Sequence, residues 1–156
     1  MLKISLLAVG KIKESYWKES LSEYGKRLSP YTKLDIIEVA AEPTGATTTG
    51  LQSMRSEAER ILARIPEGAF VVALERTGKE ISSLDFAQLL KREGEGGRTI
   101  VFIIGGAEGL DSAVLALANA KISLSKMTFV HEMARVILLE QIYRAMTIIA
   151  GKTYHR

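Results

Sequence analysis

The chain has 156 residues, of which 47% are hydrophobic and 25% are charged, as in a globular protein with a packed core. It contains no cysteine and two histidines, which excludes disulfides and thiolate metal sites, and we expect no metal site. The net charge of +3 is uneven: residues 1–33 and 121–156 carry +4 each, and residues 34–120 carry −5. If the two ends meet in space, they form a basic surface suited to a polyanion such as nucleic acid; scattered solvated lysines are the alternative.

Apolar runs and helical patterns alternate along the chain. The runs are rich in β-branched and aliphatic residues, and they predict strands at 3–9, 34–40, 69–74, 99–105 and, more weakly, 121–125. Between them, helical spacing of apolar residues predicts helices at about 14–28, 51–65, 82–92, 111–118 and 131–150. This alternation predicts an α/β fold, a parallel sheet flanked by helices, in a single domain over 1–156.

The remaining segments are interpreted more simply. "MLKISLLAVGKIK" has no small-residue cleavage site and is typical of a first strand rather than a signal peptide. No apolar stretch reaches the length of a membrane span, so we expect a cytoplasmic protein without a membrane partner. The Gly/Thr-rich loop 41–50 is either a linker or a mobile lid, and 92–99 is a solvated turn.

The motif "IIGGAEGLD" (103–111) directly follows the predicted strand 99–105. Glycines at that place let a ligand approach the backbone, and open α/β sheets bind ligands at this edge. The spacing is not that of a G-x-G-x-x-G motif, and "GKT" (151–153) lacks the earlier glycine of a P-loop. A tight structural turn is the alternative.

The predicted helix 131–150 is apolar on nearly all sides, so we expect both of its faces to be buried. One face can cover the sheet, and a second copy of the chain is the simplest partner for the other. Glu140 and Arg144 are spaced for an ordinary i,i+4 ion pair, and Arg144 needs a partner in such apolar surroundings. His131 lies at the start of this helix, where it could either cap the helix or take part in the reaction.

The chain ends in Tyr154, His155 and Arg156. These residues supply a phenol, an imidazole that titrates near neutral pH and a guanidinium that binds anions in bidentate fashion. Terminal residues usually fray, so a cluster with these three chemistries indicates a functional tail.

Three motifs together, "IGGAEGLD", "LSKMTFVHEMARVILLEQIYRA" and the terminal "YHR", resemble the bacterial ribosomal large subunit RNA methyltransferase H family, a minimal SPOUT-class group. The resemblance covers the whole chain and is weakest in loop 41–50. It implies a SPOUT-type fold with a C-terminal trefoil knot, a homodimer and S-adenosylmethionine as methyl donor. It also implies methylation of N3 of a pseudouridine in the helix 69 loop of 23S rRNA, on assembled 70S ribosomes.

By motif, the resemblance further implies where the donor binds and which residues act. The donor-binding residues would be Leu74, Gly105, Leu124, Ser125, Lys126, Met127, Thr128 and Phe129, with Leu74, Leu124 and Met127 as apolar walls. The catalytic residues would be Arg144, Tyr154, His155 and Arg156, with the tail held against the partner's donor pocket.

The mechanism that we infer is a hypothesis. His155 could remove the N3 proton, Arg144 or Arg156 could stabilise the resulting anion, and Tyr154 could stack on the base or bond to it. The terminal carboxylate of Arg156 is a rival base. Candidate phosphate contacts are Lys11, Lys13, Lys18, Lys26, Arg27 and Lys152.

Two other classes of function remain open at this point. A dinucleotide-dependent oxidoreductase shares the architecture, but the glycine spacing is wrong and no acidic residue follows about 20 residues later. A non-enzymatic ribosome-associated factor would explain the basic ends without needing a donor pocket.

Overall fold

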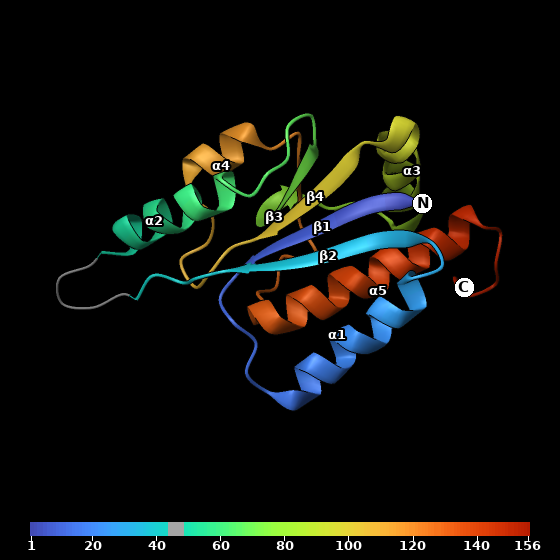
Figure 1. Ribbon diagram of the computed structural model, residues 1–156, viewed down its shortest axis with the longest axis horizontal. Helices are drawn as coiled ribbons and strands as arrows, with labels where there is room; N and C mark the ends of the chain where they lie inside the picture. The colour runs from blue at the N-terminus through green and yellow to red at the C-terminus, as the bar shows by residue number, and fades with distance from the viewer. Residues whose placement is uncertain (44–48) are drawn as a thin grey trace.

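One sheet of five parallel strands forms the centre of the protein (Figure 1). The computed structural model describes residues 1–43 and 49–156. Its strands are β1 (Leu2–Val9), β2 (Thr32–Val39), β3 (Phe70–Lys79), β4 (Thr99–Ile104) and β5 (Ala120–Ile122), in the spatial order β2-β1-β4-β3-β5. The predicted α/β class with a parallel sheet is therefore confirmed. The trefoil knot stays a prediction.

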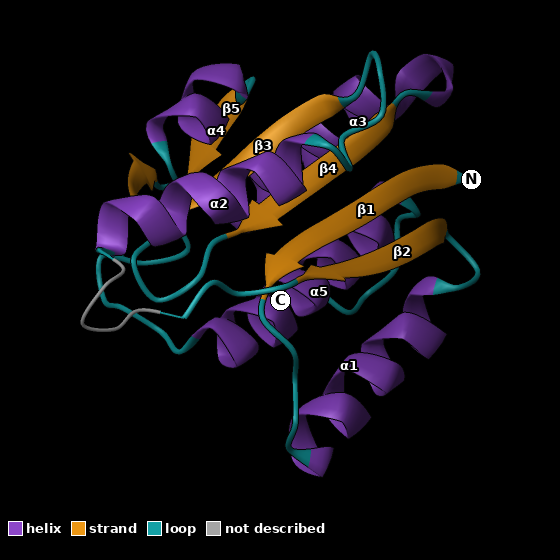
Figure 2. Ribbon diagram, turned by 60° about the vertical axis from the view of Figure 1, so that its left-hand side comes forward, coloured by secondary structure: helices purple, strands orange, loops and turns teal. Residues whose placement is uncertain are grey.

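Helices cover both faces of this sheet (Figure 2). They are α1 (Ser15–Leu28), α2 (Gly50–Leu62), α3 (Ser83–Gly94), α4 (Ser112–Leu117) and α5 (His131–Ile149), with a 3₁₀ turn at Glu95–Gly97. Helices α1, α3 and α5 pack on one face around Phe102 and Leu138, while α2 and α4 pack on the other around Val101 and Ile61. The central strands β1 and β4 are buried on both faces, which explains why their sequences are continuously apolar.

Side-chain caps set the starts of three helices. The Thr49 hydroxyl accepts the N–H of Gln52 and forms a capping box at α2. Ser82 caps α3 and Asp111 caps α4 in the same way. Residues 44–48 of the predicted lid or linker lie outside the described residues, so that prediction stays open.

Strand β3 differs most from its prediction, because it continues past Leu74 to Lys79. Its pairing with β5 shifts register between these two residues. A Cβ atom on Gly78 would lie 2.8 Å from the backbone carbon of Lys121, so only glycine allows the two chain segments to approach so closely. The predicted strand ends at residue 74 because the apolar pattern ends there, whereas the strand in the structure continues to Lys79.

Helix α5 lies between α1 and α3 as well as against the sheet (Figure 1). Two helices of the same chain thus contact the sides of α5 that do not face the sheet, so its apolar sequence does not by itself require a second copy, and the homodimer stays a prediction. Met133 and Ile149 on α5 stay 39% and 41% exposed, and Val130, just before it, is 58% exposed.

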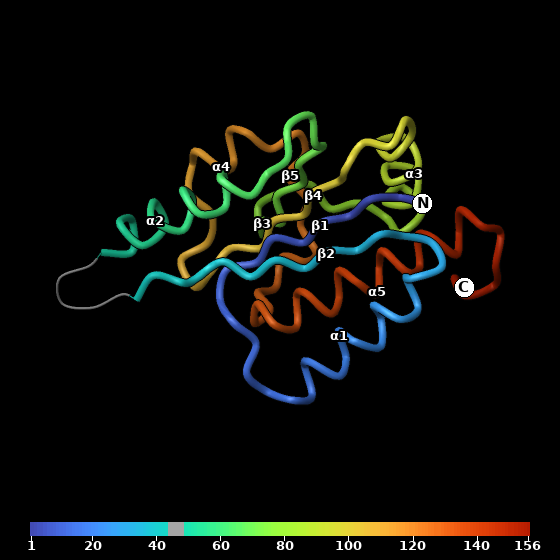
Figure 3. The backbone as a smooth tube through the Cα atoms, in the orientation of Figure 1, coloured from blue at the N-terminus to red at the C-terminus, as the bar shows by residue number. Residues whose placement is uncertain are grey.

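The C-terminal tail returns to the edge of the sheet where β1 begins (Figure 3). Lys152 Nζ donates to the Tyr31 hydroxyl at 2.6 Å, and the Leu2 N–H donates to the Tyr31 carbonyl at 3.3 Å. The two ends of the chain thus meet at Tyr31, which fulfils the condition for a shared basic surface; that this surface binds a polyanion stays a prediction. Among helices within the described ranges, none has both the length and the hydrophobicity needed to cross a bilayer.

Candidate active site

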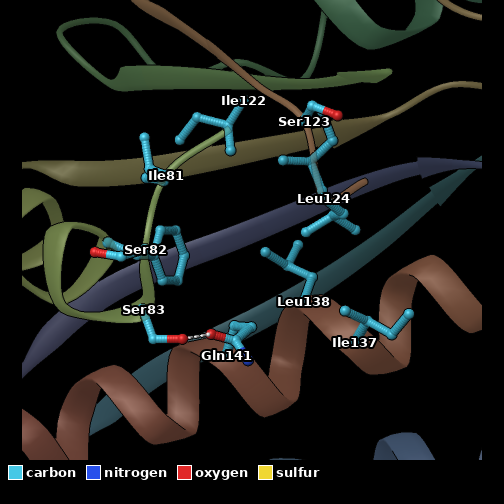
Figure 4. A pocket seen from close by; sticks show the side chains of 11 residues that line it. Ile81, Ser82, Ser83, Ile122, Ser123, Leu124, Ile137, Leu138 and Gln141 are labelled. Atoms are coloured by element: carbon cyan, nitrogen blue, oxygen red, sulfur yellow. Dashed lines mark hydrogen bonds between the residues drawn. The ribbon is translucent and has the colours of Figure 1, made fainter. Parts of the chain in front are cut away.

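A cavity of about 230 Å³ lies between the ends of β3 and β5 and the helices α3 and α5 (Figure 4). Most of its lining residues are apolar, but three serines and one glutamine make its surface about half polar. The lining residues are Leu74, Ile81, Ser82, Ser83, Phe86, Ile122, Ser123, Leu124, Ile137, Leu138 and Gln141. A cavity lined by apolar and polar groups at the carboxyl ends of parallel strands is a typical ligand site in α/β proteins.

Two of the residues predicted to bind the donor, Leu74 and Leu124, line this cavity. The other members of the loop, Ser125, Lys126, Met127, Thr128 and Phe129, follow it but do not line the cavity. Met127, predicted as an apolar wall, is 76% exposed because the chain turns outward before it. In this single chain it therefore contributes no wall.

The loop after β5 has a defined shape. Ser123 Oγ donates to the Ser125 carbonyl at 2.9 Å, and the Met127 N–H donates to Ser125 Oγ at 3.0 Å. Arg76, on the extended part of β3, donates to Thr128 Oγ1 at 3.0 Å. These contacts fix the loop before any ligand binds, which lowers the entropy cost of binding.

Gly105 does not line the cavity either, and its own loop explains why it is glycine. A Cβ atom at this position would lie 2.8 Å from the carbonyl carbon and oxygen of Gly109. Gly106 and Gly109 also form a small bridge that closes the turn. The structural-turn interpretation of 103–111 thus accounts for this glycine, and its predicted contact with a ligand stays a prediction.

The tail brings three of the four predicted catalytic residues together on α5. The Glu140 carboxylate accepts from Arg144 Nη2 at 2.6 Å and from the Tyr154 hydroxyl at 3.2 Å. Arg144 Nη1 lies 3.2 Å from His155 Nδ1, and the Arg144 guanidinium stacks 4.8 Å from the centre of the Tyr154 ring. Arg156 is exposed, and no hydrogen bond joins it to this group within the described residues. We call Glu140, Arg144, Tyr154 and His155 the tail cluster.

Electrostatics fix the protonation of two members of the tail cluster. Burial raises the pKa of Tyr154, and the charge and hydrogen bond of Glu140 raise it further. The hydrogen bond to Glu140 also raises the pKa of Arg144, although burial opposes this. At neutral pH the phenol is therefore a hydrogen-bond donor, and the guanidinium is charged.

A chain of hydrogen bonds connects the cavity to the tail cluster. Ser83 Oγ donates to Gln141 Oε1 at 2.7 Å, as drawn in Figure 4, and Gln141 Nε2 donates to Glu140 Oε2 at 2.8 Å. The sequence alone assigned neither residue a role, because Gln141 is one polar position in an apolar helix and Ser83 resembles an ordinary helix-start serine. Their pairing joins residues 58 positions apart, so no local pattern could reveal it.

A buried arginine was also missed as a functional feature. Arg135 on α5 is 1% exposed and donates to Glu38 at 2.7 Å and to the Gly10 carbonyl at 2.8 Å. Burial alone would raise the pKa of Glu38, but the hydrogen bonds from Arg135 and from the Ile12 N–H lower it overall. His131 does not cap the helix; its Nε2 lies 3.0 Å from a Glu132 carboxylate oxygen.

The parallel sheet and a cavity at its carboxyl edge define the protein as an open α/β protein built to bind a small ligand. A family model described as a predicted SPOUT methyltransferase matches residues 2–155. The chain therefore belongs to the SPOUT methyltransferase family, whose members use S-adenosylmethionine, and this decides against a dinucleotide oxidoreductase. Within the described part of the chain, no three His, Asp or Glu side chains group so that they could hold a metal ion.

Proposed function

We propose that this protein methylates N3 of a pseudouridine in the helix 69 loop of 23S rRNA, on assembled 70S ribosomes. The observation that carries the proposal is the tail cluster, in which an arginine, a phenol and an imidazole meet one turn from the cavity. Membership in the SPOUT family supplies the methyl donor. The three sequence motifs supply the target, through their resemblance to the rRNA methyltransferase family.

The cavity fits part of the donor. Its volume of about 230 Å³ is below the ~300–1,000 Å³ of usual small-molecule sites, so it suits a nucleoside-sized portion rather than the whole molecule. Leu74 and Leu124 provide apolar walls, and Ser83 and Ser123 provide hydroxyls for polar atoms. Loop 124–129 would hold the remainder. Bound there, S-adenosylmethionine supplies a methyl group on a positively charged sulfur.

The protein must then make N3 nucleophilic by taking its proton. The resting geometry constrains His155 in this role, because the N–H of Arg144 faces Nδ1, so that this nitrogen must offer its lone pair to Arg144. The proton of a neutral imidazole then sits on Nε2, and neither nitrogen is free to accept another. His155 therefore acts as a base only after it separates from Arg144, which leaves Arg144 free to stabilise the anion that forms.

If His155 separates from Arg144, a second copy of the chain can provide the site at which the tail then binds. We propose a homodimer in which the tail of each chain completes the donor site of its partner. Three apolar residues close together in the sequence, Met127, Val130 and Met133, follow β5 in the chain and are 76%, 58% and 39% exposed. Burying these side chains against another copy would supply apolar contact area, as dimer interfaces do.

Mixing two inactive variants tests the shared site. His155→Ala loses the tail function, and Leu74→Trp fills the cavity, so each alone should transfer no methyl group. If sites combine a cavity from one chain with a tail from the other, an equal mixture should recover about one quarter of wild-type activity, since half of the dimers are mixed and each holds one intact site. No recovery, with mixed dimers verified by mass spectrometry, would contradict the shared site.

The ribosome requirement is tested separately. The resemblance that supplies the target also implies that the substrate is the assembled 70S ribosome, whose shape would then be recognised. We therefore expect methylation of unmodified 70S ribosomes to be much faster than methylation of naked 23S rRNA. Equal rates on both substrates would refute recognition by ribosome shape.

A further inference from the structure

A second cleft lies at the carboxyl ends of β1, β2 and β4, on the far side of the sheet edge from the donor cavity. It has a volume of about 480 Å³, within the usual range for a small-molecule site. Its lining residues are Val9, Gly10, Lys11, Lys13, Glu14, Ala41, Glu42, Ser53, Glu57, Gly106, Ala107, Glu108, His131 and Glu132. None of them lines the donor cavity, so the two are separate sites.

The topology of the sheet creates this cleft. Strands β1 and β4 are parallel neighbours, but the helices that follow them leave to opposite faces: α1 packs with α5, and α4 packs on the side of α2. The connecting loops therefore diverge at the carboxyl ends and leave a crevice between them. Such a switch point is where open α/β sheets bind ligands in general, and the donor cavity does not occupy it.

Two lysines stand at the rim of the cleft, on a loop that the protein holds in place. Lys11 and Lys13 are exposed, whereas Ile12 between them is 5% exposed and donates its N–H to Glu38 at 2.9 Å. Arg135 grips the same loop through the Gly10 carbonyl at 2.8 Å. Arg135 on helix α5 and Glu38 thus hold the backbone of this loop in place, and with it the positions of Lys11 and Lys13.

Two buried side chains of the cleft, Glu57 and Ser53, have hydrogen-bonding capacity that the described residues do not use fully. Glu57 is 6% exposed, and within the described residues its one hydrogen bond is from the Glu42 N–H, at 3.0 Å, with no ion pair. Ser53, one helical turn earlier and 2% exposed, has no partner for its hydroxyl among the residues that the structure describes. Glu42 is different, because Arg60 neutralises it at 2.6 Å. A buried carboxylate without a cation is costly unless a ligand donates to it.

We propose that this cleft binds one nucleotide of the RNA substrate. The phosphate would lie on Lys11 and Lys13, and a base that carries an amino group would donate to Glu57 and Ser53. A nucleotide offers an anionic end for Lys11 and Lys13 and a donating base edge for Glu57 and Ser53. Glu14, Glu108 and Glu132 also line the cleft, and they too favour a ligand that brings hydrogen-bond donors beside its phosphate. The inference rests on the proposed function, since it takes RNA as the substrate.

Binding of a fluorescein-labelled RNA hairpin with an adenine-containing loop, measured by anisotropy, tests the phosphate part. The double variant Lys11→Ala/Lys13→Ala should bind at least tenfold more weakly, and the slope of log affinity against log salt should fall by about two. The control Lys33→Ala/Lys91→Ala removes the same charge from exposed positions outside the cleft and should lose less than twofold. Equal losses in the two double variants would overturn the proposal.

Variants of Glu57 and Ser53 test whether a base binds in the cleft. Glu57→Gln should weaken binding of the adenine hairpin about tenfold, and should matter less for a hairpin with uracil in the loop. Ser53→Ala removes one oxygen atom and should give a smaller loss in the same direction. Affinity for S-adenosylmethionine, measured by calorimetry, should stay unchanged in both. Unchanged RNA affinity, or a loss of donor binding instead, would overturn the proposal.

These outcomes separate the two proposals. Wild-type protein that binds RNA through the cleft but transfers no methyl group would refute the proposed function and leave the cleft assignment standing. Methyl transfer that is unchanged in all cleft variants would refute the cleft assignment and leave the proposed function standing. If the wild-type protein does not bind the free hairpin, the same variants are compared by co-sedimentation with unmodified 70S ribosomes, and equal affinity of wild type and all cleft variants would overturn the cleft assignment.

Discussion

Replacing Arg135 by methionine tests how much the buried ion pair contributes to stability. Methionine keeps most of the apolar stem but removes the guanidinium, which donates to Glu38 at 2.7 Å and to the Gly10 carbonyl at 2.8 Å. Two hydrogen bonds from a charged donor are worth about 1.5–3 kcal/mol each. Two effects offset part of this loss: the cost of burying the guanidinium disappears, and Glu38, whose side chain is 36% exposed, is rehydrated.

We therefore expect Arg135→Met to lower the free energy of unfolding by about 2–3 kcal/mol, or Tm by roughly 5–10 °C in a domain of this size. Urea unfolding, followed by circular dichroism, measures it. A matched control is Arg98→Met, because Arg98 pairs with Glu93 at 3.3 Å while 41% exposed, and it should cost less than about 1 kcal/mol.

The loss should also depend on pH in a defined direction. The pKa of Glu38 is lowered in the folded protein, so its contribution is present above its ordinary value of 4.5 and is lost as the pH falls below it. The stability difference between wild type and Arg135→Met should therefore shrink in acid. A variant as stable as wild type at pH 7, or a difference that grows in acid, would refute this reasoning.

Three further predictions concern the active site. Gly105→Ala should lower Tm and weaken donor binding, because the new Cβ would lie 2.8 Å from the backbone of Gly109; unchanged melting would contradict this. Tyr154 should be titrated by alkali, at 295 nm, above the usual tyrosine value of 10.0, since its pKa is raised, and the Tyr154→Phe difference spectrum identifies it; ionisation below that value would contradict the bond to Glu140. Ser83→Ala breaks a 2.7 Å hydrogen bond to α5 and should weaken donor binding several-fold with a stability change below about 1 kcal/mol, measured by calorimetry and urea unfolding. Full donor affinity in that variant would remove Ser83 from the site.

The regular elements could be predicted because they depend on local patterns. Each predicted helix and strand exists, with bounds that differ by a few residues, since apolar periodicity reports which faces are buried. Strand β3 is the exception: the residues after Leu74 are mostly polar, and the strand continues through them to Lys79, which pairs with Ile122 of β5. Long-range pairing of this kind leaves no trace in a local window.

The candidate site divides in the same way. The Glu140–Arg144 pair follows from helical spacing and is confirmed at 2.6 Å. That Tyr154 and His155 return to this pair depends on how the tail folds back, which no spacing encodes. Met127 is 76% exposed in the single chain, so its predicted role as an apolar wall stays a prediction; a family motif gives the order of residues along the loop and not the direction in which each points.

Methyl transfer from tritiated S-adenosylmethionine to 70S ribosomes that lack the modification tests the central claim most directly. The full chain should label 23S rRNA, and a chain ending at Thr153 should bind the donor but transfer little or no label, because it lacks Tyr154 and His155. Equal labelling by both chains would contradict the role of the tail cluster. No labelling by the full chain, with the donor bound, would contradict the proposed target.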